Sequence, residues 1–274
     1  MTLRLSGKFS ALRTLAVPCG LAFLAAVLPW NANAADILQS ASGFAVLAGS
    51  TVTNTGPTVI TGDVGVSPGT AITGFPPGTV VGSIDSNNTA AIQAEVDLGS
   101  AYSYLSGLDF NTDLTGQDLG GQTLTAGVYK FDSSAALTGA LTLSGPGDFI
   151  FQIGSTLTTA SDASIVTSAG ANASDIYFQV GSSATVGTDS ALQGNIVALQ
   201  SITMTTGATL TGRALAINGA VTMDTNTITA PSSTPEPGTV MLFGLSMIGM
   251  AILTSRRASS LRFRLPRAKA HSTS

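Results

Sequence analysis

Between Gly127 and Pro231 the chain repeats one pattern of apolar and polar positions. Each unit opens with an apolar run (GVYKFDS, FIFQIGS, IYFQVGS, NIVALQS or RALAING) and continues as short strings in which threonine alternates with apolar residues. Equivalent positions in successive units lie 18 to 27 residues apart. Repeats of this length, built from short β-rich pieces, are typical of solenoids. The pattern predicts a β-helix in which each unit forms one coil.

The strings within a unit predict different surroundings. The opening runs, such as 149–153 and 176–180, are apolar on both alternating sides, which is typical of strands buried on both faces. The second and third strings alternate, so one side faces the core and the other faces solvent. Their outward side is mostly threonine and almost free of charge. We therefore expect one covered face and two open faces.

A helix is predicted at about residues 89–106, capped by Asn88 or Thr89. Its apolar stripe has helical periodicity and is wide. This helix is the segment of suitable size to cover the opening runs, so we expect it to lie lengthwise along them. The members of the stripe are Ala91, Ile92, Ala94, Val96, Leu98, Gly99, Ala101, Tyr102 and Leu105.

Before the helix, residues 44–48, 51–55 and 58–68 read as three short strands, which would make one further coil. The Gly- and Pro-rich segment 69–86 is predicted to be a loop or a cap.

Charge and cysteine content exclude several classes of function. Fourteen acidic side chains lie between Asp36 and Asp224, against only Lys130 and Arg213, so nucleic acid is excluded as a partner. The single cysteine, Cys19, lies in the N-terminal leader. No acid–base pair, metal-ligand cluster or phosphate loop is visible. The sequence therefore predicts a protein that is not an enzyme and has no catalytic residue, metal or cofactor.

Both ends of the chain carry targeting features. Residues 1–34 have a basic start, an apolar run and the site Ala32-Asn33-Ala34, which together predict a secretory signal peptide cut after Ala34. An uncleaved membrane anchor is the alternative. Residues 35–231 then form the predicted β-helix domain.

At the C-terminal end, residues 232–257 combine a linker, an uncharged apolar segment and a basic pair, followed by a basic tail at 258–274. This order resembles the PEP-CTERM sorting signal of Gram-negative bacteria, which implies processing by an exosortase-type enzyme. The apolar segment predicts a membrane helix that anchors the protein transiently before processing. A plain C-terminal anchor is the alternative. The residues that carry the resemblance are Pro235, Glu236, Pro237, Arg256 and Arg257.

The span from about Asp36 to Pro231 resembles the bacterial and fungal ice-binding-protein-like family. The resemblance is carried by motifs at 60–68 (ITGDVGVSP), 118–129, 148–153, 176–180 and 210–216. It implies a mainly β fold, a discontinuous right-handed β-helix of triangular section with one long α-helix along one face. Ice-active members use one flat face, to which the outward threonines of the second strings would map. These are Thr138, Thr156, Thr158, Thr185, Thr203, Thr205 and Thr222.

The predicted function is that of a secreted or surface-displayed antifreeze-like protein that adsorbs to an ice crystal surface. Threonine methyl groups shape a layer of ordered water and hydroxyl groups anchor it. A threonine-rich outer face can also be merely a soluble β-surface, because threonine favours strands. A third possibility is a cell-surface or matrix adhesion protein that binds exopolysaccharide, although few aromatic residues fall at outward positions where sugars could stack.

Overall fold

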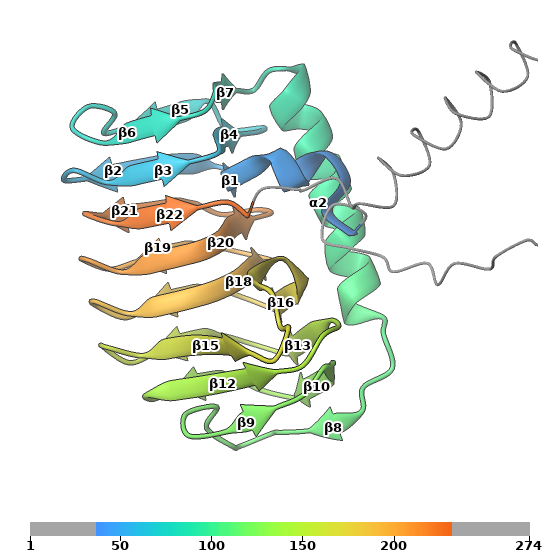
Figure 1. Cartoon of the computed structure of the whole chain (residues 1–274). Coiled ribbons are helices and arrows are strands. Elements are labelled where there is room, and N and C mark those ends of the chain that lie inside the picture. The colour runs from blue at the N-terminus through green and yellow to red at the C-terminus, as the bar shows by residue number, and fades with distance from the viewer. Residues whose placement is uncertain (1–36, 232–274) are drawn as a thin grey trace, which may run out of the picture. The chain divides into compact units, whose positions relative to one another are not determined.

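The computed structural model describes residues 37–231, which form a stack of coils made of short parallel strands, with one α-helix beside it (Figure 1). Each coil contributes strands to three faces in turn. The helix face contains β8 (Thr112–Asp113), β10 (Gly127–Phe131), β13 (Phe149–Ile153), β16 (Ile176–Val180), the second halves of β18 (Ala191–Ala198) and β20 (Thr209–Ala216), β1 (Phe44–Ala48), β4 (Asp63–Val66) and β7 (Ile84–Ser86).

The two other faces follow along each coil. The threonine face is the seven-stranded sheet of β11 (Ala135–Leu137), β14 (Leu157–Thr159), β17 (Ala184–Val186), β19 (Ile202–Met204), β21 (Val221–Asp224), β2 (Thr51–Thr55) and β5 (Ala71–Thr73). The third face contains β9 (Thr123–Leu124), β12 (Ala140–Ser144), β15 (Ser164–Ser168), the first halves of β18 and β20, β22 (Thr227–Thr229), β3 (Val59–Thr61) and β6 (Thr79–Val81).

The N-terminal coils stack on the C-terminal coil. Strand β2 pairs with β21, β3 pairs with β22, and β1 lies between β20 and β4. The predicted N-terminal coil is therefore confirmed, but its third predicted strand (58–68) is two strands: β3 ends the first coil and β4 begins the next on the helix face. The prediction of a loop or cap for residues 69–86 was wrong in part. They form β5 and β6, which complete a second N-terminal coil with β4, and β7, which pairs with β4; their Gly and Pro residues occupy the turns.

Helix α2 (Thr89–Ser106) carries the chain from this end of the stack toward β8 at the other end (Figure 1). The side chain of Asn88 caps it by accepting a hydrogen bond from the Ala91 amide. Its buried side is narrower than predicted, because Ile92 and Val96 are about half exposed. The buried positions are Ala91, Ala94, Leu98, Ala101 and Leu105.

The helix face is covered by more than α2. Ile37 and Leu38, with Ala41 of the short 3-10 helix η1 (Gln39–Gly43), join α2 in one buried cluster with outward side chains of the helix face. Those outward side chains include Ile150, Tyr177, Val197, Leu215 and Leu47. The continuous apolar runs are thus buried on both sides, as predicted, and the N-terminal segment supplies the cover that α2 does not reach. A second 3-10 helix, η2 (Ala173–Asp175), lies before β16.

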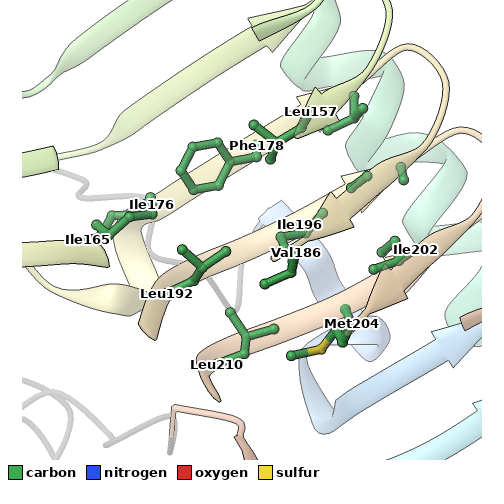
Figure 2. Packing of buried hydrophobic residues seen from close by; sticks show 14 of the residues in the cluster. Leu157, Ile165, Ile176, Phe178, Val186, Leu192, Ile196, Ile202, Met204 and Leu210 are labelled. Carbon is green, nitrogen blue, oxygen red and sulfur yellow. The ribbon is translucent and has the colours of Figure 1, made fainter. Parts of the chain in front are cut away.

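The interior of the stack is filled by inward side chains from all three faces. Figure 2 shows Leu157 and Met204 from the threonine face with Leu192 and Leu210 from the third face and Phe178 from the helix face. The rings of Phe151 and Phe178 stack at 4.7 Å between centroids. Burial of each such side chain stabilises the fold by roughly 1.5–3 kcal/mol. The core therefore repeats with the coils and holds the outer faces rigid.

The length of α2 matches the stack that it covers. Its 18 residues span about 27 Å. It contacts strands of the helix face from β7 to β13, which are six strand spacings or about 29 Å apart. The buried positions alternate three and four residues apart, so successive ones advance by about 5.3 Å, close to the 4.8 Å spacing of the strands.

Within residues 37–231 no helix is long and apolar enough to cross a membrane. The predicted signal peptide (1–34), the membrane segment, the sorting residues Pro235 to Arg257 and the basic tail all lie outside the described residues.

Candidate functional site

Six threonines form one straight column across the threonine face. Thr158 pairs with Thr185, Thr185 with Thr203 and Thr203 with Thr222. The column continues through Thr53 and Thr73 of the N-terminal coils. Neighbouring members are about 4.8 Å apart, as strand spacing requires. All are exposed except Thr203, which is half-buried. None of the six hydroxyl groups makes a hydrogen bond to another group of residues 37–231, so all six are available to water.

The other three predicted threonines lie in the positions flanking this column, where their hydroxyl groups are engaged. Thr156 shares a hydrogen bond with Ser134 at 2.8 Å. Thr205 donates to the backbone carbonyl of Val186 at 2.7 Å. Thr138 donates to the carboxylate of Asp118 at 2.9 Å. The structure therefore divides the seven predicted site residues into four with unengaged hydroxyl groups (Thr158, Thr185, Thr203 and Thr222) and three with engaged ones.

Acidic residues border the array without crossing it. Asp118 lies beyond the β11 end of the array and accepts hydrogen bonds from the Gly120 and Thr138 amides. Burial alone would raise the pKa of Asp118, but these hydrogen bonds have the larger combined effect and the pKa is lowered. Of the residues in the seven strands only Asp224 is charged. Its carboxylate accepts from the hydroxyl groups of Thr206 and Thr225. A hollow of about 270 Å³ lies beside Asp224 and is lined partly by Thr203 and Thr222.

Thr53 and Thr73 were missed as site residues by sequence reasoning. Both alternate with buried or half-buried neighbours in short strings, TVTNT and AIT, which is the same local pattern as in the repeats. Their place in the column depends on the pairing of β2 with β21, between segments about 170 residues apart. The alternation could have marked them as outward, but not as neighbours of Thr222.

The third face carries a shorter threonine array. Thr209 pairs with Thr227, and Thr211 pairs with Thr229, which pairs with Thr61. The array is interrupted by the exposed side chains of Val59 and Val81, and toward β12 it gives way to alanine and serine. The longer uninterrupted column is thus on the threonine face.

Residues 37–231 contain no group of three or more His, Cys, Asp and Glu side chains that could hold a metal ion. The buried Asn195 and Arg213 hydrogen-bond to one another and to carbonyl groups near the edge between the third face and the helix face. The outward surface of the threonine face accordingly offers hydroxyl and methyl groups and a single carboxylate.

Residues 46–229 match the sequence profile of the ice-binding-like family. The chain belongs to this family. It is 50% identical over 249 residues to an ice-binding protein of Nostoc sp. (strain HG1), covering 85% of this chain and 91% of that protein. An ice-binding protein of Flavobacterium frigoris is 34% identical, over 71% of this chain and 76% of that protein. Ice-binding proteins are not enzymes, so the prediction of a non-enzymatic protein is confirmed.

Solved ice-binding structures share the fold. The crystal structure of an ice-binding protein from the Antarctic ascomycete Antarctomyces psychrotrophicus superposes with a TM-score of 0.70 at 44% identity, covering 72% of this chain and 98% of that chain. An ice-binding protein from an Antarctic biological consortium gives 0.68 at 50% identity, over 70% of this chain and 89% of that chain. The mainly β architecture with one long helix is therefore shared by this ice-binding-like chain and these proteins.

The C-terminal prediction is also confirmed at the level of the motif. Residues 233–257 match the PEP-CTERM protein-sorting motif, which implies processing by an exosortase and export to the cell surface of a Gram-negative bacterium.

Proposed function

We propose that this ice-binding-like protein adsorbs to ice through the threonine face. The observation that supports this most directly is the column of six in-register threonines whose hydroxyl groups have no partner within residues 37–231. The proposed contact set consists of the predicted Thr138, Thr156, Thr158, Thr185, Thr203, Thr205 and Thr222, extended by Thr53 and Thr73.

Each threonine of the column offers one methyl and one hydroxyl group at a regular spacing. Water held between such groups is ordered before it meets the crystal, because the backbone ladder and the packed core fix the spacing. A charged side chain holds its own hydration shell tightly, so the scarcity of charge in the seven strands favours a water layer that can merge with a lattice. We further propose that the coils wind as a right-handed β-helix of triangular section, which would make each face flat.

Export and attachment complete the proposal. The mature chain would begin after Ala34, and the apolar segment after Pro237 would hold it in the membrane until an exosortase acts. The relatives, which are ice-binding proteins, give no support to the alternative of exopolysaccharide adhesion. The seven strands of the threonine face contain no aromatic residue on which a sugar could stack.

The test compares two pairs of substitutions in residues 35–231. Thr185→Tyr with Thr203→Tyr alters neighbouring members of the column, and Thr211→Tyr with Thr229→Tyr alters a matched neighbouring pair on the third face. We expect the first pair to lose most of the thermal hysteresis and recrystallisation inhibition and the second pair to keep them, with both folded by circular dichroism. An unmodified domain that leaves ice growth unchanged at high concentration would refute the proposed function, and loss only in the second pair would move the site to the third face.

A further inference from the structure

Both ends of the described chain lie next to one side chain, that of Arg213. The Arg213 guanidinium donates from Nε to the Ser42 carbonyl at 2.9 Å and from a terminal nitrogen to the Pro231 carbonyl at 3.1 Å. Its other terminal nitrogen donates to Asn195 at 2.9 Å. Ser42 lies just before β1 and Pro231 just after β22, so the two ends of the domain meet at this residue.

Arg213 is only 2% exposed, and its three acceptors are neutral oxygens. Burial lowers the pKa of its guanidinium. Because a buried cation is costly unless its donors are satisfied, these hydrogen bonds hold the chain ends firmly in place. Pro231 is thus a fixed point from which the C-terminal segment departs.

This point lies on the edge away from the threonine face. In each coil the chain passes from the helix face to the threonine face and then to the third face. Strands β18 and β20 run continuously from the third face into the helix face, bending at Gly194 and Gly212, which are paired. Asn195 and Arg213 come directly after these bends. Of the three edges, this is the one that no strand of the threonine face adjoins.

The sorting motif starts close to this edge. It begins at residue 233, and Pro235 follows Pro231 by four residues, which span at most about 14 Å when fully extended. A domain held through this motif would therefore stay near its attachment point, with the edge at Arg213 toward the attachment surface.

We propose that the domain is attached to the cell envelope through its C-terminal end at this edge, before and after processing of the sorting segment, so that the threonine face points outward and a cell carrying the protein is held to ice. This inference rests on the proposed function of the threonine face. It adds the orientation of the domain, with ice on one side and the cell envelope on the other. Attachment through any residue of the threonine face would cover the array, whereas attachment beyond Pro231 leaves it open.

The test uses oriented attachment to beads. Residues 37–231 form two continuous buried apolar clusters, and a fragment of residues 35–233 retains both of them. This fragment has no cysteine, because Cys19 lies outside it, so single cysteines can be coupled cleanly. Ser233→Cys attaches the fragment through the proposed edge. Ala136→Cys attaches it through the threonine face, because Ala136 is exposed on β11 beside Thr158 and is not a member of the contact set. Both would be coupled at equal density to maleimide beads, and capture of the beads by a growing ice surface would be counted.

We expect Ser233→Cys beads to be captured and Ala136→Cys beads to remain in the liquid, while both uncoupled variants inhibit ice recrystallisation. Equal capture of both beads, or capture only through Ala136→Cys, would overturn the orientation while leaving the proposed function intact. An uncoupled unmodified fragment without any effect on ice growth would instead refute the proposed function, and the attachment model with it.

Discussion

The Glu95 carboxyl group lies partly buried on α2, and its Oε1 atom has no hydrogen-bond partner among residues 37–231. Burial raises the pKa of Glu95 to about 8. The folded state therefore favours the protonated form, whereas the unfolded chain ionises near the ordinary value of 4.5. This residue opposes folding at neutral pH.

The pH dependence of stability follows from that difference. Between about pH 4.5 and pH 8 the folded state binds more protons at Glu95 than the unfolded state, so stability falls as pH rises, by as much as about 5 kcal/mol. We expect Glu95→Gln to flatten the dependence of the unfolding free energy on pH in this window and to raise stability at pH 8. Asp97→Asn is the matched control on the same helix. Hydrogen bonds from Ser40 lower the pKa of Asp97, so this substitution leaves the slope of the unfolding free energy between pH 4.5 and pH 8 unchanged. An unchanged slope in Glu95→Gln would contradict the prediction.

Gly212 is required by the close approach of two backbones. A Cβ atom at this position would lie 1.8 Å from the carbonyl oxygen of Gly194 on the neighbouring strand, and neither backbone can move without breaking the ladder. We expect Gly212→Ala to destabilise the domain by more than about 3 kcal/mol or to prevent folding. Gly99→Ala, in open space on α2, should instead stabilise by about 0.5–1 kcal/mol. Thermal unfolding followed by circular dichroism measures both; similar melting temperatures would show that the bend tolerates a side chain.

At the scale of elements, α2 is held by one narrow row of side chains. Leu98 is fully buried in the cluster between α2 and the helix face, whereas Val96, two residues before it, is 60% exposed. We expect Leu98→Ala to lower the unfolding free energy by about 2–5 kcal/mol and Val96→Ala to change it by less than about 0.5 kcal/mol. Denaturant titration of both variants is the measurement. Equal effects would mean that the exposed side of α2 is packed in solution.

Elements with a long periodic pattern could be predicted from the sequence, and those that depend on distant pairing could not. The unbroken apolar runs at Phe149–Ile153 and Ile176–Val180 indicated a covered face, and the stripe of α2 indicated its cover. The strands β5 to β7 are only three residues long, too short for a period to be recognised between Gly and Pro. Ile92 and Val96 looked buried because an apolar stripe does not reveal how wide its partner surface is.

At the scale of the whole molecule, the candidate surface is assembled from both ends of the described chain. The first coils, with Thr53 and Thr73, complete the column begun by Thr158, although they are synthesised before the rest. No local sequence pattern encodes this joining of the two ends, since it depends on the pairing of β1, β2 and β3 with β20, β21 and β22. Outward direction could thus be inferred from the sequence, but the length of the column could not.

Because the length of α2 matches the strands beneath it, coils can be added to the stack only two at a time, together with seven residues in α2. Seven helical residues add about 10.5 Å and return the buried row to its original side, while two coils add about 9.6 Å. We expect a chain with residues 181–216 duplicated, Arg213→Asn in the inner copy and a heptad inserted in α2 to melt near the parent temperature. The same duplication without the heptad should melt lower, because α2 would leave strands uncovered. The larger protein would offer two more column threonines, so we expect it to show stronger thermal hysteresis than the parent. The threonine face could thus be widened by two coils for every seven residues added to α2.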